Sequence, residues 1–315
     1  MTPAGSRGPL RCVGRMGAAA LSAAAATLSI GVATAAPASS CGPATVTTEV
    51  AAHIPLLDWS ENLTVDRDGD LWVSRPFRSV VERYNHEGRR TASVGIPTPD
   101  SVRLGPDGLL YVNYINATSG ALPPGGGVAR FDPAAPQPHL ESFASGLRFP
   151  NGSAFDTAGN LYVADTLFGV VRIRPDGTTD RDWTDRAPKT LGPNGFNTNG
   201  IVASGDSLYV TYTISPAARV IRIPLADPAH PTVAADLAAA PLTLPAFPDD
   251  LALGPGGLLY VATASGGLVR VDPATRSTCT VLSGPPITSV AVVPGSDRAL
   301  YLGSEGGDVL RVHLN

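Results

Sequence analysis

The sequence predicts an all-β protein folded as a six-bladed β-propeller. Three observations lead to this fold class. A strand–turn–strand pattern occurs six times, its spacing is that of a propeller blade, and an extra strand-like segment near the N-terminus can close the ring. No stretch after residue 36 shows a long period of 3.6 residues, so we expect few helices.

The repeat consists of a polar residue, a short apolar strand, a turn and a second apolar strand centred on an aromatic residue. Its first copy spans residues 61–73 and its second copy spans 100–112. The six central aromatic residues are Trp72, Tyr111, Tyr162, Tyr209, Tyr260 and Tyr301. The gaps between them are 39, 51, 47, 51 and 41 residues. Other propeller repeats have similar periods of roughly 40–50 residues.

A third strand follows each aromatic strand. Its alternating apolar residues occupy 80–84, 127–131, 170–174, 219–223, 268–271 and 309–312. The sixth copy stops after this third strand, whereas the strand-like segment 44–54 precedes the first copy and has no blade of its own. We therefore expect the N-terminal strand to complete the last blade and close the ring, because open strand edges invite aggregation.

The first 36 residues have the features of a secretory signal peptide. Arg7, Arg11 and Arg15 precede a run of small and apolar residues at 16–32, and Ala-Thr-Ala-Ala at 33–36 offers a cleavage site. We expect a secreted protein with one propeller domain over residues 37–315 and no membrane span after cleavage. The alternative is an uncleaved membrane anchor, although this alanine-rich run is short for a span.

Two cysteines, Cys41 and Cys279, remain once Cys12 has left with the signal peptide. An even number of cysteines in an exported protein favours a disulfide. Cys279 lies in the fourth strand of copy five, beside the expected seam, so a bond to Cys41 would strengthen the closure. Lipidation of Cys41 is the alternative.

The charge of the chain argues against one class of partner. The formal net charge is −4 and no run of lysine or arginine occurs, so we do not expect nucleic-acid binding. We expect a monomer whose partner is a small-molecule substrate.

The first strand of each propeller blade lines the central channel. At the start of these strands stand Glu61, Asp100, Asn151, Asn199, Asp249 and Thr288. Such a ring of oxygens suits a divalent metal, most readily Ca²⁺, with Mg²⁺ or Mn²⁺ as alternatives. The other interpretation is a polar channel mouth in which the Asn-Gly and Pro-Asp pairs only shape the backbone.

Loops between the second and third strands open on the same face as these strand starts. Asn113 and Tyr114 begin a long loop over 113–126, and the approach to copy four over 182–198 is also long. We take Asn113, Tyr114, Asp165 and Tyr212 as candidate substrate-binding residues. Asp165 has an equally good interpretation as a structural hydrogen-bonding residue between blades.

Residues 149–156 read Phe-Pro-Asn-Gly-Ser-Ala-Phe-Asp and residues 161–165 read Leu-Tyr-Val-Ala-Asp. These segments resemble the third blade of the SMP-30/gluconolactonase/LRE-like propellers, and the resemblance runs from about residue 55 to the C-terminus. It implies a divalent metal bound by Glu61, Asn151 and Asp249, with Asn199 as a further ligand. It also implies a role for the aspartate as the base in lactone hydrolysis.

The sequence departs from the family pattern at two ligands and at the substrate element. Asn62 follows the blade-one glutamate, where many lactonases of the family have Gly or Ser-Pro. The family's Pro-Asp-Gly is Pro-Asp-Asp at 248–250 in this chain. The Arg-x-Asn element with which the sugar lactonases bind substrate has no match. Sugar-lactone specificity is therefore not implied. Residues 59–63, 198–201 and 248–253 resemble a secreted, poorly characterised branch whose relatives include enzymes that catalyse cyclisations in natural-product pathways.

Three functions follow from these observations. The first is a metal-dependent hydrolase of lactones or related esters, in which Asp249 or Asp100 takes a proton from water. The second is a non-hydrolytic cyclase or lyase that uses the same pocket. The third is a non-catalytic exported propeller that binds a ligand on its loop face.

Overall fold

The computed structural model describes residues 39–116, 125–190, 196–215, 217–237 and 246–315. The predicted signal peptide and the middle of the two long loops lie outside these residues. No helix among the described residues is long and apolar enough to cross a membrane.

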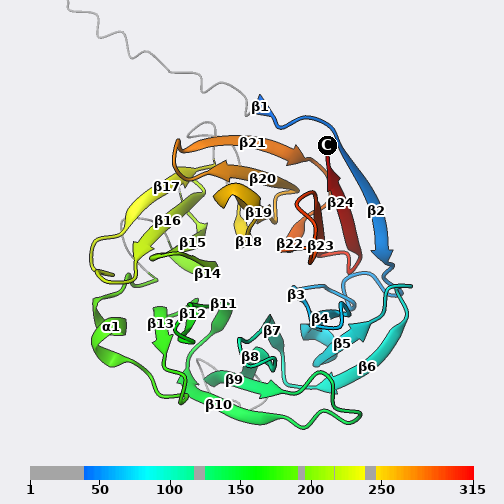
Figure 1. Cartoon of the computed structure of the whole chain (residues 1–315), viewed down its shortest axis with the longest axis horizontal. Helices are drawn as coiled ribbons and strands as arrows, with labels where there is room; N and C mark the ends of the chain where they lie inside the picture. The colour runs from blue at the N-terminus through cyan, green and yellow to red at the C-terminus, as the bar shows by residue number, and fades with distance from the viewer. Residues whose placement is uncertain (1–38, 117–124, 191–195, 216, 238–245) are drawn as a thin grey trace, which may run out of the picture. The chain divides into compact units, whose positions relative to one another are not determined.

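Six antiparallel sheets surround a central axis and confirm the six-bladed propeller (Figure 1). Blade 1 contains β3 (Asn62–Val65), β4 (Leu71–Arg75), β5 (Val80–Tyr84) and β6 (Arg90–Gly95), with the 3-10 helix η1 (Pro76–Arg78) after β4. Blade 2 contains β7 (Pro99–Leu104), β8 (Leu110–Asn116), β9 (Gly125–Phe131) and β10 (Glu141–Leu147). Blade 3 contains β11 (Pro150–Phe155), β12 (Leu161–Asp165) and β13 (Gly169–Ile173), and α1 (Arg181–Arg186) lies outside β13.

The second half of the ring repeats the same order from the axis outward. Blade 4 contains β14 (Phe196–Ser204), β15 (Ser207–Ile214), β16 (Arg219–Pro224) and β17 (Thr232–Asp236). Blade 5 contains β18 (Pro248–Leu253), β19 (Leu259–Thr263), β20 (Gly267–Asp272) and β21 (Ser277–Leu282), with η3 (Pro255–Gly257) after β18. Blade 6 contains β22 (Ile287–Val292), β23 (Ala299–Ser304) and β24 (Val309–Leu314).

The N-terminal strand closes the ring as the sequence predicts. β2 (Ala44–Val50) pairs antiparallel with β24 and supplies the fourth strand of blade 6. A short strand that we did not anticipate, β1 (Ser39–Ser40), pairs in parallel with β21 of blade 5. The disulfide between Cys41 and Cys279 is present, with a Cα–Cα distance of 5.2 Å, and it ties β1 to β21 directly beside the seam.

The buried core lies between the blades and forms six apolar clusters. Each cluster joins two neighbouring blades, as Trp72 of blade 1 and Phe131 of blade 2 do with ring centroids 5.2 Å apart. Successive side chains of a strand point to opposite faces, so Trp72 packs toward blade 2 while Val73 packs toward blade 6. This alternation explains why the aromatic residues repeat at the blade period.

Candidate functional site

A backbone irregularity marks the start of the inner strand in five of the six blades. Asp100, Asn151, Asn199, Asp249 and Thr288 all lie where the pairing register shifts. A β-bulge of this kind bends the strand and re-aims a side chain, and such bulges are common beside active sites. In blade 1 the pairing is regular, and the N–H of Glu61 donates to the carbonyl of Ser74 at 3.2 Å.

The glycines of the Asn-Gly pairs are explained by close contact between blades. A Cβ atom at Gly152 would lie 2.6 Å from the carbonyl oxygen of Asn199, and one at Gly200 would lie 2.6 Å from that of Asp249. Neither glycine has a positive φ, so turn geometry is not the reason for them. The same contacts bring Asn151, Asn199 and Asp249 next to one another on blades 3, 4 and 5.

Carboxylates from four blades influence one another at this end of the channel. Burial raises the pKa of Glu61 to about 7; the hydrogen bond from Trp59 opposes this rise, and the charges of Asp250 and Glu305 add to it. Burial likewise raises the pKa of Asp100 well above its usual range, and the negative charges of Glu61 and Asp250 add to the effect. These groups therefore resist ionising together.

Asp249 shows the same behaviour. Burial is the main cause that raises its pKa well above the usual range, followed by the charges of Glu61, Asp250 and Asp100, while Asn199 opposes the rise. Asp249 is half-buried, whereas Asp100 is only 7% exposed. Asp249 is thus the more accessible of the two candidate bases.

Trp59 holds the carboxylate of Glu61 in place. Its indole Nε1–H donates to Oε2 of Glu61 at 2.5 Å, and its ring packs edge-on against Phe77 with centroids 5.7 Å apart. The sequence motif 59–63 contains this residue, but its role was not foreseen, because only the fold shows that the indole turns back on the acid two residues later.

Arg103 crosses the channel below the carboxylates. Its Nη2 donates to both carboxylate oxygens of Asp250, each at 3.0 Å, and its Nη1 donates to Oδ1 of Asn62 at 2.6 Å. Asn62 also donates to Asp250 at 3.0 Å, so the three side chains form a buried polar network. Sequence reasoning missed this network. Alignment of the repeats would have shown Arg103 as a charged residue where the other copies have Thr64, Ala154, Val202, Ala252 and Ala291.

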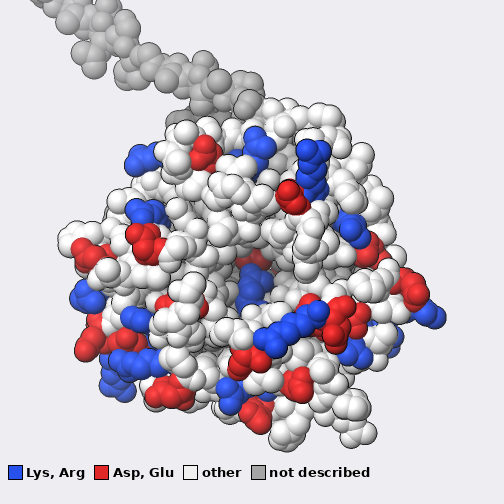
Figure 2. All heavy atoms as spheres, in the orientation of Figure 1, with Lys and Arg blue, Asp and Glu red and all other residues white. Residues whose placement is uncertain are grey.

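Beyond Arg103 the wall of the channel changes from polar to mainly apolar. A cavity of about 320 Å³ is lined by residues of all six inner strands, most of them apolar, and Arg103 is the charged residue among them. On the face shown in Figure 2 the centre of the ring is hollowed, and basic and acidic atoms lie at the bottom of the hollow. The polar ring therefore occupies one end of the channel and a mainly apolar wall the other.

Two of the four candidate substrate-binding residues, Asn113 and Tyr114, lie on β8 and are buried or half-buried. Asn113 is fully buried and donates from Nδ2 to the carbonyl of Asn151, so it helps to fix the backbone of a residue at the channel end. Tyr114 is half-buried and packs against the core between blades 1 and 2. These positions favour a supporting role for Asn113 and a packing role for Tyr114.

The positions of Asp165 and Tyr212 favour structural roles as well. Asp165 is 1% exposed, and its carboxylate accepts the N–H groups of four residues: Arg148, Phe149, Leu167 and Phe168. Tyr212 is 1% exposed within the core between blades 3 and 4, and burial raises its pKa to about 12. The four hydrogen bonds favour the inter-blade interpretation of Asp165, which also lines a cavity of about 430 Å³. The burial of Tyr212 favours a packing role.

The residues at the channel end fit a hard cation through oxygen atoms alone. Within the described ranges no three His, Cys, Asp or Glu side chains form a metal-binding group by themselves, so a cation would also need amide oxygens. Oδ1 of Asn199 is buried and has no hydrogen-bond partner there, and its Nδ2 is engaged by Thr213 at 2.9 Å. A free amide oxygen beside crowded carboxylates is the donor set that calcium prefers.

Comparison with known proteins supports the fold. Residues 235–271 match the family described as strictosidine synthase-like, N-terminal, and no curated protein matches the chain. A gluconolactonase from Xanthomonas campestris has 18% identity and a TM-score of 0.62, covering 89% of this chain and 98% of its own. A calcium-binding regucalcin from Agrobacterium tumefaciens has 17% identity and a TM-score of 0.63, covering 85% and 95%.

A third solved structure with this fold is a lyase. A virginiamycin B lyase from Staphylococcus aureus has 12% identity and a TM-score of 0.59, covering 86% of this chain and 100% of its own. At these identities the likeness establishes the fold and agrees with the resemblance seen in the sequence. A gluconolactonase, a calcium-binding protein and a lyase share this fold, so the reaction has to be argued from the site.

Proposed function

We propose that this protein is a metal-dependent hydrolase of lactones or related esters, with Ca²⁺, or alternatively Mg²⁺ or Mn²⁺, held at the channel end. Glu61, Asn151, Asn199 and Asp249 would hold the cation. One observation carries the proposal: carboxylates whose pKa values are raised by burial and by one another converge beside a buried amide oxygen that has no partner. A divalent cation offsets this repulsion and uses this oxygen.

The chain's own groups supply proton transfer and orientation. When bound, the cation polarises the carbonyl of the substrate and lowers the pKa of a water molecule. Asp249 would take the proton from water, because it is the more accessible of the two candidate carboxylates and a raised pKa makes a carboxylate a stronger base. Asp100 is the alternative base. Trp59 keeps Glu61 oriented.

The surface around the channel favours a substrate with an apolar part. Of the seven exposed large apolar residues among those described, six lie in segments at the end of the ring where the inner strands begin: Ile54, Leu56, Leu57, Phe77, Leu167 and Ile214. Phe77 packs on Trp59, which contacts Glu61. Apolar surface that adjoins a polar site marks a binding region for an apolar ligand. We therefore propose apolar lactones or esters as substrates.

The test combines metal content with turnover. Purified protein is analysed for bound metal and assayed with alkyl lactones, aryl esters and a sugar lactone, with and without Ca²⁺. We expect Asp249→Asn to lower kcat about 10²-fold or more and Glu61→Gln to lower calcium affinity. Glu141→Gln, an exposed acid on β10, serves as the matched control and should change neither. Absence of turnover on the whole panel would refute the hydrolase.

A non-hydrolytic reaction in the same pocket is the second candidate. A buried carboxylate of raised pKa can remove a proton from carbon as well as from water, and a lyase with this fold is known. Product analysis in ¹⁸O-labelled water separates the two reactions. Hydrolysis introduces the label into the product acid, whereas elimination or cyclisation does not.

We also propose that the protein is exported after cleavage of residues 1–36. The disulfide between Cys41 and Cys279 supports this proposal, because such bonds persist in oxidising compartments. Mass spectrometry of the secreted protein should give Pro37 as the first residue. A cell-associated protein that retains Arg7 and Arg11 would contradict it.

A further inference from the structure

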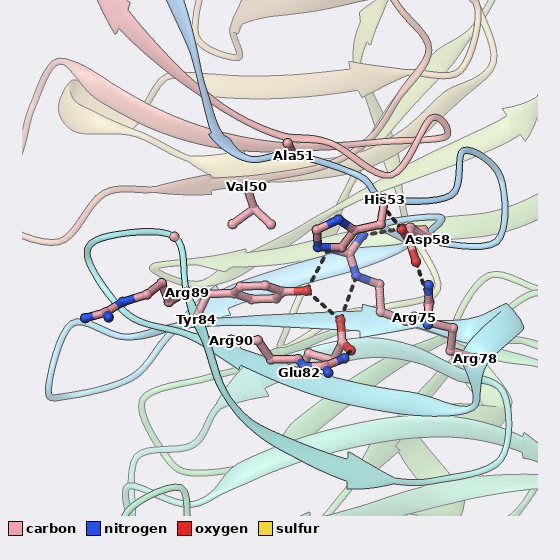
Figure 3. A pocket seen from close by; sticks show the side chains of 11 residues that line it. Val50, Ala51, His53, Asp58, Arg75, Arg78, Glu82, Tyr84, Arg89 and Arg90 are labelled. Atoms are coloured by element: carbon pink, nitrogen blue, oxygen red, sulfur yellow. Dashed lines mark hydrogen bonds and ion pairs between the residues drawn. The ribbon is translucent and has the colours of Figure 1, made fainter.

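A second cavity lies at the seam where the ring closes. It has a volume of about 590 Å³ and is lined by the end of β2, by Asp58, and by residues of β4, β5 and the hairpin at 88–90. In Figure 3 Val50 and Tyr84 face each other across the open space, with His53 and Arg75 at one end and Arg89 at the other. None of its lining residues belongs to the carboxylate ring or to the axial cavity. We call it the seam cavity.

The seam cavity is positively charged in an otherwise acidic chain. Its wall contains four arginines and two carboxylates, while the whole chain has a formal net charge of −4. A concave site with an excess of one charge concentrates ligands of the opposite charge. The seam cavity therefore favours an anion.

The two carboxylates in the wall are already fully engaged. Both oxygens of Asp58 accept hydrogen bonds, Oδ2 from the N–H groups of His53 and Ile54 at 2.7 Å each and Oδ1 from Nε of Arg78. Burial opposes the ionisation of Asp58, but these donors outweigh it and lower its pKa. Asp58 is therefore charged at neutral pH and has no free oxygen.

Glu82 is satisfied in the same way. Oε1 accepts from Nη1 of Arg90 at 2.6 Å, and Oε2 accepts from the hydroxyl of Tyr84 at 2.5 Å. Burial opposes ionisation of Glu82 too, yet the hydrogen bonds from Tyr84 and Arg90 and the charge of Arg75 lower its pKa.

Several cationic donors in the wall remain unused. Within the described residues, Arg78 donates only from Nε and Arg90 only from Nη1. Arg75 is 2% exposed and is already engaged: Nη1 donates to the carbonyls of Asp58 and Gly307, Nη2 donates to the hydroxyl of Tyr84 at 3.3 Å, and Nε lies 3.4 Å from Oε2 of Glu82. Guanidinium groups bind carboxylates through paired N–H donors, so an incoming carboxylate can take the donors that Asp58 and Glu82 leave free.

We propose that the seam cavity binds a small organic acid, with its carboxylate against the free donors of Arg78 and Arg90. The apolar body of this ligand lies between Val50 and the ring of Tyr84, which are 5% and 8% exposed. The ligand contacts both the end of β2 and β5 of blade 1, so its binding also holds β2 against blade 1 and raises the stability of the folded state. This site is independent of the proposed hydrolase.

The experiment measures binding of benzoate, its neutral isostere benzamide, and inorganic phosphate to the full exported chain by calorimetry and thermal unfolding. We expect benzoate to bind with a Kd below about 1 mM and to raise the Tm, and benzamide and phosphate to bind at least tenfold more weakly. Arg78→Gln and Arg90→Gln should each weaken benzoate binding about tenfold. Both side chains reach solvent, with 29% and 57% of their surface exposed, so we expect the variants to fold.

Arg130→Gln is the matched control, because its side chain is 31% exposed and paired to an acid but lies outside the cavity. It should bind benzoate as the wild type does. Three results would overturn the proposal: benzamide binding as tightly as benzoate, phosphate binding in preference to benzoate, or unchanged affinity in both arginine variants. Nuclear magnetic resonance shifts at the amides of His53 and Ile54 locate the ligand independently of affinity.

Discussion

Replacing Arg103 with methionine tests whether the network across the channel stabilises the ring. The substitution removes both hydrogen bonds to the Asp250 carboxylate, each 3.0 Å long, and the bond to Asn62. The Asp250 side chain is only 4% exposed, so it would become a buried carboxylate without a cationic partner, keeping only the hydrogen bond from Asn62. Breaking a buried pair in this way costs about 3–5 kcal/mol. We expect a loss of about 3 kcal/mol, since Arg103 retains 17% exposure.

Urea unfolding followed by tryptophan fluorescence measures this loss as a lower midpoint at unchanged slope. The double variant Arg103→Met/Asp250→Asn removes the stranded charge and should recover at least half of the lost stability. A single variant that loses less than about 1 kcal/mol would refute the reasoning, and so would a double variant no more stable than the single. The matched surface substitution Arg219→Gln should change stability by less than about 0.5 kcal/mol.

Three further predictions concern the seam and the carboxylates. The disulfide joins residues 238 apart, for which chain entropy gives about 5 kcal/mol, so the Cys41→Ser/Cys279→Ser variant should lose about 3–5 kcal/mol in urea unfolding. Because the pKa of Glu61 is raised to about 7 in the folded state, metal-free protein should lose stability as the pH rises from about 4.5 to 7, and Glu61→Gln should lessen this loss. Trp59→Phe removes the hydrogen bond that lowers the pKa of Glu61. Because calcium binds the ionised carboxylate, we expect calcium affinity to reach half its maximum at a higher pH in this variant, as measured by titration calorimetry.

The fold was predictable because its signals repeat. Each blade carries an aromatic residue on its second strand, and alternation of side chains places that residue between blades. The missing strand of blade 6 was predictable for the same reason, since β2 had no other partner. The short strand β1 carries no such signal: it has only two residues, which pair with β21 next to the disulfide.

The ring of polar residues was predictable in position but not in environment. Counting along the repeats puts Asp100, Asn151 and Asp249 at the starts of the inner strands, where the structure has register shifts that the sequence did not predict. The same counting could not show that the Asp165 carboxylate accepts hydrogen bonds from four backbone N–H groups, or that Tyr212 is buried. Exposure and hydrogen bonding of a loop residue depend on which neighbouring loop folds over it, and a single sequence does not contain this information.

The second aspartate of Pro-Asp-Asp and Arg103 depend on one another. At Asp250 a carboxylate lies close enough to raise the pKa values of Glu61, Asp100 and Asp249, and alone it would add another unpaired charge to a crowded site. Arg103 and Asn62 reach it from blades 2 and 1 and satisfy it. The positive charge of Arg103 offsets the negative charge of Asp250. In the proposed function, the remaining carboxylates are then available to bind a cation or to accept a proton. Glycine at this position, as in the family pattern, needs no such partner. Replacing Asp250 with glycine would therefore leave Arg103 as an uncompensated cation directly below the candidate metal site, and the departure from the pattern is tolerable only because both residues are present.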